Sequence, residues 1–560
     1  MNFNDPLTPF HDLKRVADLS AILIRHGFGD LVGRMGLTGT ALRAGQSLTA
    51  SKSATPEGLT PPERLRMALE EMGPTFVKLG QVLSSRIDLL PPAYIAELEK
   101  LRDSVPPVSF SALRAEVEAE RSHPLTDDFS DIDPVPLGAG SIAQVHHARL
   151  HSGAQVILKI RRPGIRTLIE ADLRLLMRLA DIATAESADI RRFRPHEVVA
   201  EFAHSIRCEL DLANECRNAE RIAANFRDCA HIQVPRVHWE WTSGVMNVQD
   251  TVTGVPGTNL EAARRAGLDL RKIAARGADA VLQMMLVDRF FHADPHPGNV
   301  FYLPGDQIVF IDFGMVGHIS RQRRDELVDL LTGVVERRPD AVTRILLDWA
   351  GVGLAANPDL EARIEGFINR VHGLPLKSLN LSALVLDLIA EVRVHDLALP
   401  PDLTMLIKVF TTLDGMGREL DPDFDIAAAA QPFLQRLILE RYSPARLARN
   451  ARDGLMAGAG LMNRLPDDLG RLLSAAQKGT LSFGIEIRKM DNLMDRFDRS
   501  VTRMTLGVLI AALIMGSSIV MTVVEGELPV GLTIFAMAGF FGAVAGGLWL
   551  LWSILRGGKD

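Results

Sequence analysis

Hydrophobic and polar positions follow different periods in successive parts of this 560-residue chain. Apolar residues recur with helical spacing over 64–90, fall into short alternating or continuous blocks over 132–160, and return to helical spacing over 166–228. Residues 325–500 again have the pattern of helices joined by short loops. Helices, then strands, then helices predict an α+β protein with more than one domain.

Local signals predict where several elements begin and break. Thr60, followed by two prolines and then Glu63, forms a capping box that predicts a helix start. A Gly-Pro pair at Gly73 predicts a kink or break in that helix. The runs DPVPLGAGSIAQVHHARL and AQVILKI predict strands around a glycine turn, and VPRVHWEW and GVMNVQDTV predict two further strands.

The C-terminal end is the most apolar part of the chain. Residues 504–524 and 530–552 contain no charged side chain, and each is long enough to cross about 30 Å of hydrocarbon. Basic residues flank the pair and the EGELP connector is acidic, so we expect a transmembrane hairpin with both ends in the cytoplasm. The alternative is a buried hairpin in a soluble core. Gly542 and Gly546 form a G-x-x-x-G that permits, without requiring, a homodimer.

Charge and cysteine content exclude several classes of protein. A formal net charge of −7 provides no overall basic field, so we expect no nucleic-acid partner. The 3 cysteines lack metal-ligand spacing, which argues against a zinc site or a disulfide framework and fits a reducing cytosol. Near the N-terminus, the amphipathic segment 10–37 either lies at a membrane surface or packs on the main domain as a helix.

The clearest chemistry lies in the stretch FFHADPHPGNVFYLPGDQIVFIDFGMVG. Asn299 follows Asp294 at the spacing of a kinase catalytic loop, and Asp312 opens an Asp-Phe-Gly turn. Carboxylate and amide oxygens suit Mg²⁺, so we expect Asn299 and Asp312 to bind the metal. Asp294 is expected to act as a general base or to orient a water, and His292 to brace the loop. The alternative is a polar loop beside an ordinary turn.

A nucleotide also requires a loop and a cation for its phosphates. The turn made by Gly138, Ala139, Gly140 and Ser141 can bring backbone N–H groups close to phosphate oxygens. Lys159 points away from the apolar face of its strand, beneath this turn. The alternatives are an ordinary hairpin turn and a lysine on a solvated strand face.

The segment IRCELDLANECRNAERI offers Lys159 a carboxylate partner. It supplies Glu209, Asp211 and Glu215, and in a single helix Asp211 and Glu215 share one face. We expect Glu215 to pair with Lys159. The alternative is local pairing of these acids with neighbouring arginines.

Several of these motifs occur together in one known family. KLGQ at 78–81, LRDSVPP, GAGSIAQVH, ILKIRRPG, ELDLANE and HADPHPGN with IDFG resemble the UbiB family of atypical kinase-like proteins. The resemblance covers about 60–430 and the apolar tail, and it implies a protein-kinase-like two-lobed fold with an N-terminal helical extension. It implies that Lys78 and Gln81 lie in an extension folded over the nucleotide site, which blocks protein substrates, and that Glu209 and Asp211 work with it. Taken alone, KLGQ would indicate only a solvated helix whose glycine permits close packing.

The resemblance also implies a function. The family supports ubiquinone biosynthesis as a membrane-stimulated ATPase, so we expect ATP and Mg²⁺ as cofactors, and membrane lipids, isoprenoid quinone precursors and other quinone-biosynthesis proteins as partners. The expected location is the bacterial inner membrane, with the kinase-like domain facing the cytoplasm. The alternatives are a small-molecule kinase of the aminoglycoside or choline type and a non-catalytic pseudokinase scaffold. Gly138 and Gly140 depart from the family's alanine-rich loop, so no unusual nucleotide preference is carried over.

These patterns divide the chain into six expected segments. They are an amphipathic segment and linker (1–59), a helical extension (60–130), a small lobe with a helical insertion (131–258), a large lobe (259–440), a helical juxtamembrane region (441–503) and the transmembrane hairpin (504–552).

Overall fold

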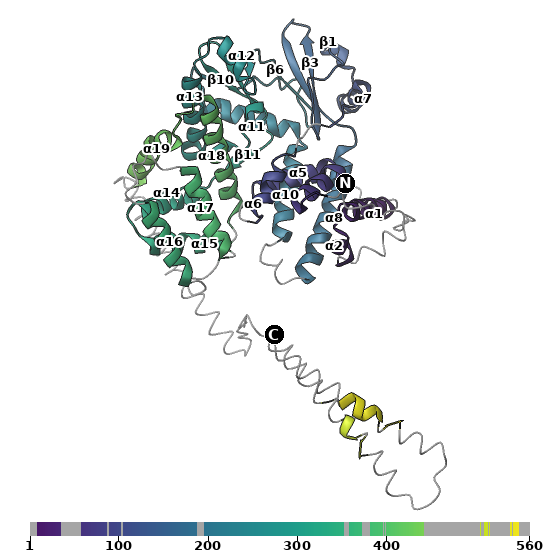
Figure 1. Cartoon of the computed structure of the whole chain (residues 1–560). Helices are drawn as coiled ribbons and strands as arrows, with labels where there is room; N and C mark the ends of the chain where they lie inside the picture. Colours follow the sequence, from purple (N-terminus) through teal and green to yellow (C-terminus); the bar gives the residue numbers. More distant parts are fainter. Residues whose placement is uncertain are drawn as a thin grey trace, which may run out of the picture. The chain divides into compact units, whose positions relative to one another are not determined.

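The computed structural model describes most of the chain up to residue 441 and short stretches beyond it. The described residues are 8–34, 58–86, 89–101, 105–186, 195–351, 358–371, 381–395, 397, 399–441, 505, 509–512, 514–515, 538–539 and 541–547. They belong to two compact units, Met1–Ala448 and Arg449–Asp560, each considered by itself (Figure 1).

Helices form the first part of the segment 60–130, which was expected to be a helical extension: α4 (Pro61–Met72), α5 (Pro74–Ser84) and α6 (Pro92–Leu98). Two helices precede it, α1 (Thr8–Arg25) and α2 (Gly29–Arg34). The capping box is confirmed, because the Thr60 N–H donates to the Glu63 carboxylate over 2.7 Å. The break is confirmed as well: Gly73 has a φ of 101°, which glycine adopts without strain, and separates α4 from α5.

The N-terminal amphipathic segment packs on this extension as a helix. Ala17, Leu19 and Ile22 of α1 are buried, and the two larger side chains join one apolar cluster with residues of α4, α5 and α8 (Ile165–Glu186). Of the two readings of the sequence, the structure therefore shows the packed helix.

The small lobe is built on an antiparallel sheet of order β1-β3-β4-β6, with β2 paired to β3. Val156, Leu158 and Ile160 of β4 are fully buried on one face of this sheet, under α7 (Phe110–Arg121). The strands are β1 (Phe129–Ile132), β2 (Gly138–Ala139), β3 (Ala143–Leu150), β4 (Gln155–Arg161) and β6 (Met246–Asp250). The run VPRVHWEW, expected to be a strand, forms only a single bridge between Val237 and Gln249, because the chain turns at Trp239–Thr242.

The acidic segment is two helices rather than one, which corrects the expectation from the sequence. α10 (Pro195–Glu209) ends at Glu209, and α11 (Leu212–Asn225) begins after Asp211. The Asp211 side chain accepts a hydrogen bond from the Ala213 N–H, which satisfies a free donor at the start of α11. Asp211 and Glu215 consequently do not share a continuous helix face.

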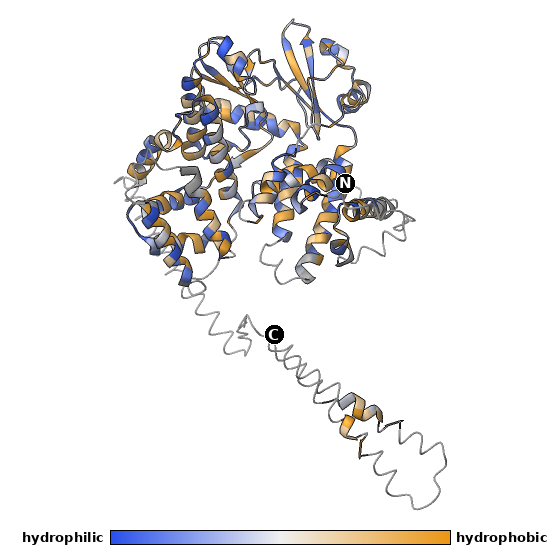
Figure 2. Ribbon diagram, in the orientation of Figure 1, coloured by the Kyte–Doolittle hydropathy of each residue, from blue (hydrophilic) through white to orange (hydrophobic). Residues whose placement is uncertain are grey.

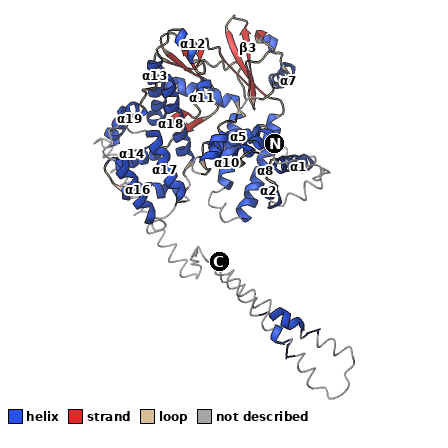
Figure 3. Ribbon diagram, viewed as in Figure 1, coloured by secondary structure: helices blue, strands red, loops and turns tan. Residues whose placement is uncertain are grey.

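The large lobe surrounds a second sheet with helices. Its sheet has the order β5-β10-β9-β7, and β8 pairs with β11 in a second, two-stranded sheet. In Figure 3, strands drawn in red lie close to α12 and α13. The strands are β5 (Ile232–Gln233), β7 (Val255–Pro256), β8 (Phe290–His292), β9 (Val300–Leu303), β10 (Gln307–Phe310) and β11 (Val316–His318). The helices are α12 (Leu260–Arg265), α13 (Leu270–Leu282), η3 (Gln283–Asp288), η4 (Pro297–Asn299), α14 (Arg321–Val335), α15 (Pro339–Ala350), α16 (Pro358–Val371), α17 (Leu381–Val394), α18 (Pro401–Leu420) and α19 (Ile426–Arg441).

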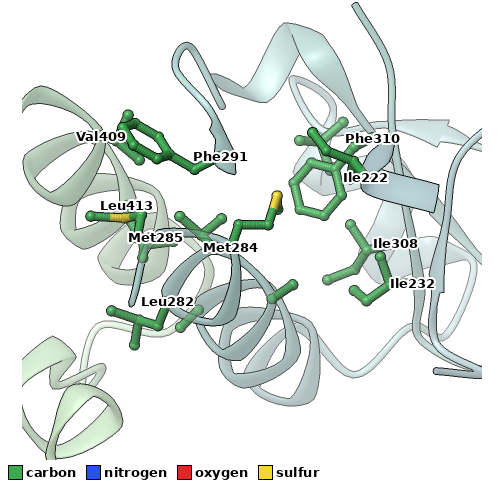
Figure 4. Close-up of a cluster of buried hydrophobic side chains, with 14 of the residues drawn as sticks. Ile222, Ile232, Leu282, Met284, Met285, Phe291, Ile308, Phe310, Val409 and Leu413 are labelled. Carbon is green, nitrogen blue, oxygen red and sulfur yellow. The ribbon is translucent and has the colours of Figure 1, made fainter. Parts of the chain in front are cut away.

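One apolar cluster holds the large lobe together. In Figure 4, Phe291 of β8 and Met285 of η3 lie against Val409 and Leu413 of α18. Figure 2 shows the corresponding stripes, with hydrophobic and hydrophilic residues on different sides of the helices. This packing fixes the position of the loop that follows β8, which carries the candidate catalytic residues.

The expected membrane hairpin falls mainly outside the described residues. The described residues within 504–524 and 530–552 are helical. In the part of the chain that the structure describes, no helix has both the length and the apolar character needed to cross a bilayer.

Candidate functional site

The strand β4 brings Lys159 to two carboxylates. The Lys159 Nζ lies 2.9 Å from the Glu215 Oε1 and 3.3 Å from the Asp312 Oδ2. Lys159 leaves β4 on the side opposite the buried Val156, Leu158 and Ile160, as alternation along a strand requires. The expected pair with Glu215 is therefore confirmed.

One ammonium and two carboxylates compete at this point. Burial opposes the charged form of Lys159, but Asp312 and Glu215 outweigh it and raise its pKa. Burial raises the pKa of Glu215 to about 7 against the effect of Lys159. The pKa of Asp312 is lowered, because Lys159 and Lys78 outweigh the partial loss of solvent around its half-exposed carboxylate. Asp312 therefore carries the negative charge, and Glu215 is the group that accepts a proton most easily.

The Asp-Phe-Gly turn is held from several sides. Asp312 has a φ of 58°, a left-handed conformation that aspartate tolerates better than most residues. Its Oδ1 accepts a hydrogen bond from the Gly314 N–H over 3.2 Å. The Asn218 side chain of α11 donates to the Phe313 carbonyl over 3.0 Å. The turn is thus attached to the helix that supplies Glu215.

The loop after β8 presents Asp294 and Asn299. His292 accepts from the Asp294 N–H at Nδ1 and donates from Nε2 to the Ile311 carbonyl, both over 3.2 Å. Burial lowers the pKa of His292, which keeps it neutral and suited to this brace. The Asn299 amide donates to the Asp294 carbonyl over 3.2 Å, and the Ile311 N–H bonds the Asn299 carbonyl. Asn299 therefore lies beside the residue that precedes Asp312.

Two nitrogen-bearing side chains face the Asp294 carboxylate. The Lys408 Nζ of α18 lies 3.4 Å from Oδ1, and the His296 Nε2 lies 3.6 Å from Oδ2. The His296 Nδ1 accepts the Gly298 N–H, so the proton of the neutral ring is on Nε2 and faces Asp294. Lys408 lies outside the motifs described above, and its one signal in the sequence is that it is a single lysine in the apolar run TMLIKVF.

The glycine turn is fixed at its base and contains an unsatisfied hydroxyl. The Gly140 N–H bonds the Ala143 carbonyl, and the Arg162 Nε donates to the Gly140 carbonyl over 2.8 Å. Ser141 is 1% exposed, and its Oγ has no hydrogen-bond partner among the described residues. A buried hydroxyl without a partner is costly, and a phosphate oxygen would satisfy it.

The extension reaches the site through Lys78. Its Nζ lies 2.7 Å from the Glu209 Oε1, and its charge acts on Asp312 as described above. Gln81 instead donates to the Leu101 carbonyl inside the extension. Asp211 pairs with Arg217 over 2.9 Å, so local pairing, the alternative reading, is correct for this acid. The structure thus brings Lys78 and Glu209 together and leaves Gln81 and Asp211 in local contacts.

The donor set fits a magnesium ion carried by a nucleotide. Such an ion requires only one or two protein oxygens, because phosphate and water supply the rest. Asp312 and the neighbouring Asn299 offer that number. Asp312 is charged, and its side chain is 46% accessible. Within the described residues, no group of three His, Cys, Asp or Glu side chains is arranged to hold a metal.

Two lobes, a strand lysine paired with a helix glutamate, and the order Asp294, Asn299, Asp312 define a protein-kinase-like fold. Comparison with known proteins identifies the particular branch. The chain matches the ABC1 atypical kinase-like domain over residues 100–346, the UbiB helical domain over 364–425 and the ABC1/UbiB kinase-like C-terminal domain over 488–556. The chain belongs to the UbiB family of atypical kinase-like proteins.

Individual relatives cover most of the chain. A probable protein kinase UbiB of Pseudomonas paraeruginosa is 35% identical over 420 residues, which span 74% of this chain and 79% of that protein. The protein of the same name from Azotobacter vinelandii is 33% identical over 455 residues, spanning 79% and 84%. A solved structure titled "The complex structure of Rv3197-erythromycin from Mycobacterium tuberculosis" has a TM-score of 0.42 and 22% identity, covering 63% of this chain and 90% of that one.

Proposed function

We propose that this protein is a magnesium-dependent ATPase of the kinase-like fold that supports isoprenoid quinone biosynthesis at a membrane. The observation that carries the proposal is the contact of Lys159 with both Glu215 and Asp312, over 2.9 and 3.3 Å. It unites the groups that phosphoryl transfer requires, a cation for phosphates and a carboxylate for the metal. A scaffold without catalysis has no need of this arrangement.

Each side chain has a distinct task in this proposal. Lys159 binds the α- and β-phosphates, assisted by the backbone of the Gly138–Ser141 turn and the Ser141 hydroxyl. Asn299 and Asp312 hold Mg²⁺, which neutralises charge on the phosphate oxygens. Asp294 orients the attacking water, and His292 fixes the loop that presents it. Catalysis then rests on positioning and charge stabilisation.

Water is the acceptor that we favour over a protein side chain. The extension lies at the site through the contact between Lys78 and Glu209, over 2.7 Å. Glu209 in turn lies next to Gly314 of the Asp-Phe-Gly turn. Helices at this place would obstruct a polypeptide substrate but leave room for water.

The membrane and quinone parts of the proposal have separate support. Two uncharged segments at the C-terminus have the length of bilayer spans, and the basic residues around them favour a cytoplasmic site. Two relatives that are 35% and 33% identical to this chain over the aligned residues carry the UbiB name. We therefore propose lipid-bound quinone precursors as the molecules that ATP turnover mobilises, in the inner membrane of a bacterium.

The test is phosphate release from MgATP by the purified full-length chain. Turnover is measured with and without vesicles of anionic lipid and with a 2-alkylphenol, and the position of the γ-phosphate is followed. Asp312→Asn should lower turnover at least about a hundredfold, because it removes a charged metal ligand. Asp306→Asn is the matched control, since Asp306 has the same φ of 58° and lies in the β9–β10 turn.

Three outcomes would redirect the proposal. Phosphate found on a small molecule or on a protein would indicate a kinase. Equal turnover by wild type and Asp312→Asn would mean that the measured activity comes from another source. The absence of any turnover would favour a non-catalytic scaffold.

A further inference from the structure

Asp294 has a lysine beside it that comes from a distant helix. Lys408 lies in α18, and its Nζ is 3.4 Å from the Asp294 Oδ1. Both side chains are partly exposed, at 23% for Lys408 and 33% for Asp294, so an incoming ligand can contact either group. The pair is therefore an accessible ammonium and carboxylate rather than a sealed structural ion pair.

The packing of α18 fixes where this ammonium lies. Val409, the next residue, is fully buried, and Leu413 one turn later is 5% exposed. Both join the cluster that includes Phe291, only three residues before Asp294 (Figure 4). The helix and the loop after β8 thus share one core, so rigid packing sets how close the backbone of Lys408 lies to that of Asp294.

The other two lysines of the site are engaged elsewhere. Lys159 lies between Glu215 and Asp312, and Lys78 lies against Glu209. Neither contact involves Asp294. The attacking and leaving oxygens lie on opposite sides of the transferred phosphoryl group. Lys408 lies beside Asp294, and therefore on the side of the attacking water.

We propose that Lys408 is a catalytic residue whose ammonium contacts the γ-phosphoryl oxygens during transfer. This proposal rests on the ATPase function proposed above. Negative charge on those oxygens must be stabilised while the phosphoryl group lies between its two partners. A flexible lysine stem allows Nζ to contact a phosphate oxygen while it remains close to Asp294.

Hydrolysis transfers the γ-phosphoryl group of ATP to water. The water oxygen bonds to the γ-phosphorus while the bond from that phosphorus to the β–γ bridging oxygen breaks. ADP leaves with the bridging oxygen and the electron pair of that bond. One water proton passes to Asp294 and then to solvent, and the other stays on the phosphate. Lys408 retains its proton throughout.

The experiment measures binding rather than turnover alone. Affinity of the full-length chain is determined for MgADP and for MgADP with aluminium fluoride, which occupies the place of the transferring phosphoryl group. In wild type, aluminium fluoride should increase the affinity for MgADP. In Lys408→Met this increase should be about a hundredfold smaller, while the Kd for MgADP alone should be unchanged. Lys408→Arg should keep most of the tightening because the charge remains.

Controls separate direct contact from support of Asp294. Lys272→Met removes a lysine whose side chain is 61% exposed in the same lobe and should behave as wild type. If Lys408 contacts the phosphoryl group itself, the double variant with Asp294→Asn should bind the fluoride complex more weakly than Asp294→Asn alone. A double variant no weaker than Asp294→Asn would show that Lys408 acts only through Asp294, which would overturn the proposal.

The remaining outcomes distinguish this proposal from the function on which it rests. Full fluoride tightening in Lys408→Met would overturn the role of Lys408 and leave the ATPase function intact. The ATPase function would be overturned if fluoride raises the affinity of the wild-type protein for MgADP but the protein releases no phosphate from ATP. In that case, loss of the fluoride effect in Lys408→Met would still support the contact of Lys408 with the phosphoryl group. A wild type that binds no MgADP would overturn both.

Discussion

Arg15 of α1 makes a partly buried contact whose removal should weaken the attachment of the N-terminal helix. Its guanidinium donates to both oxygens of Asp172 in α8, over 2.7 and 3.0 Å, and to the Met72 carbonyl over 2.8 Å. The Asp172 side chain is fully buried and also accepts the Thr75 hydroxyl of α5 over 2.6 Å. One carboxylate thus connects α1, α8 and the helix that carries Lys78.

The magnitude follows from this burial. Removing one partner of a buried ion pair costs about 3–5 kcal/mol, and we expect the lower end because Thr75 still donates to Asp172. Leu19 and Ile22, the large buried side chains of α1, contribute about 1.5–3 kcal/mol each. Arg15→Met should therefore remove about a third to a half of the attachment energy and raise the local opening of α1 roughly a hundredfold, at 1.4 kcal/mol for each factor of ten.

Hydrogen exchange followed by mass spectrometry is the assay. Arg15→Met should speed exchange in 8–25. It should also speed exchange in α5, because Arg15 no longer holds the Asp172 carboxylate to which Thr75 donates. Arg25→Met is the matched control on the same helix: its ion pair with Glu71 is exposed, at 51% and 39% for the two side chains, and is worth about 0–1 kcal/mol. Equal exchange in the two variants would refute the assignment of the anchor to Asp172.

Two further predictions concern the site and the extension. Burial raises the pKa of Glu215 from 4.5 to about 7, so its contribution to stability is complete below pH 4.5 and is lost as the pH rises through about 7. In magnesium-free buffer, the Tm of wild type relative to Glu215→Gln should fall over that range, and a constant difference would contradict the assignment. A Cβ on Gly80 would overlap Leu101 and crowd Leu69, so Gly80→Ala should lower the free energy of unfolding by about 1–3 kcal/mol. Gly138→Ala is the control, because a Cβ there meets nothing within 4 Å, and it should leave the free energy of unfolding unchanged. Equal free energies of unfolding for the two variants in chemical denaturation would count against tight packing at Gly80.

The sequence predicted the parts of the site that lie within single motifs. The alternation of β4 was enough to orient Lys159, and of the three acids in the following segment the favoured one, Glu215, is the partner that the structure shows. Asp211 was assigned to a helix interior because its role as an N-cap depends on where the previous helix ends, which periodicity does not determine. Lys408 was missed because its contact with Asp294 joins two elements far apart in the chain, and no local rule relates them.

The junction of α10 and α11 links the site around Lys159 mechanically to the extension. In protein kinases, the position of the helix with the paired glutamate is a control point for activity. Here that helix is joined to the Asp-Phe-Gly turn by Asn218 and, through Glu209 just before it, to Lys78. The Arg161 guanidinium also donates to the Leu210 carbonyl at the junction. Displacement of the extension would therefore also displace the Asp-Phe-Gly turn.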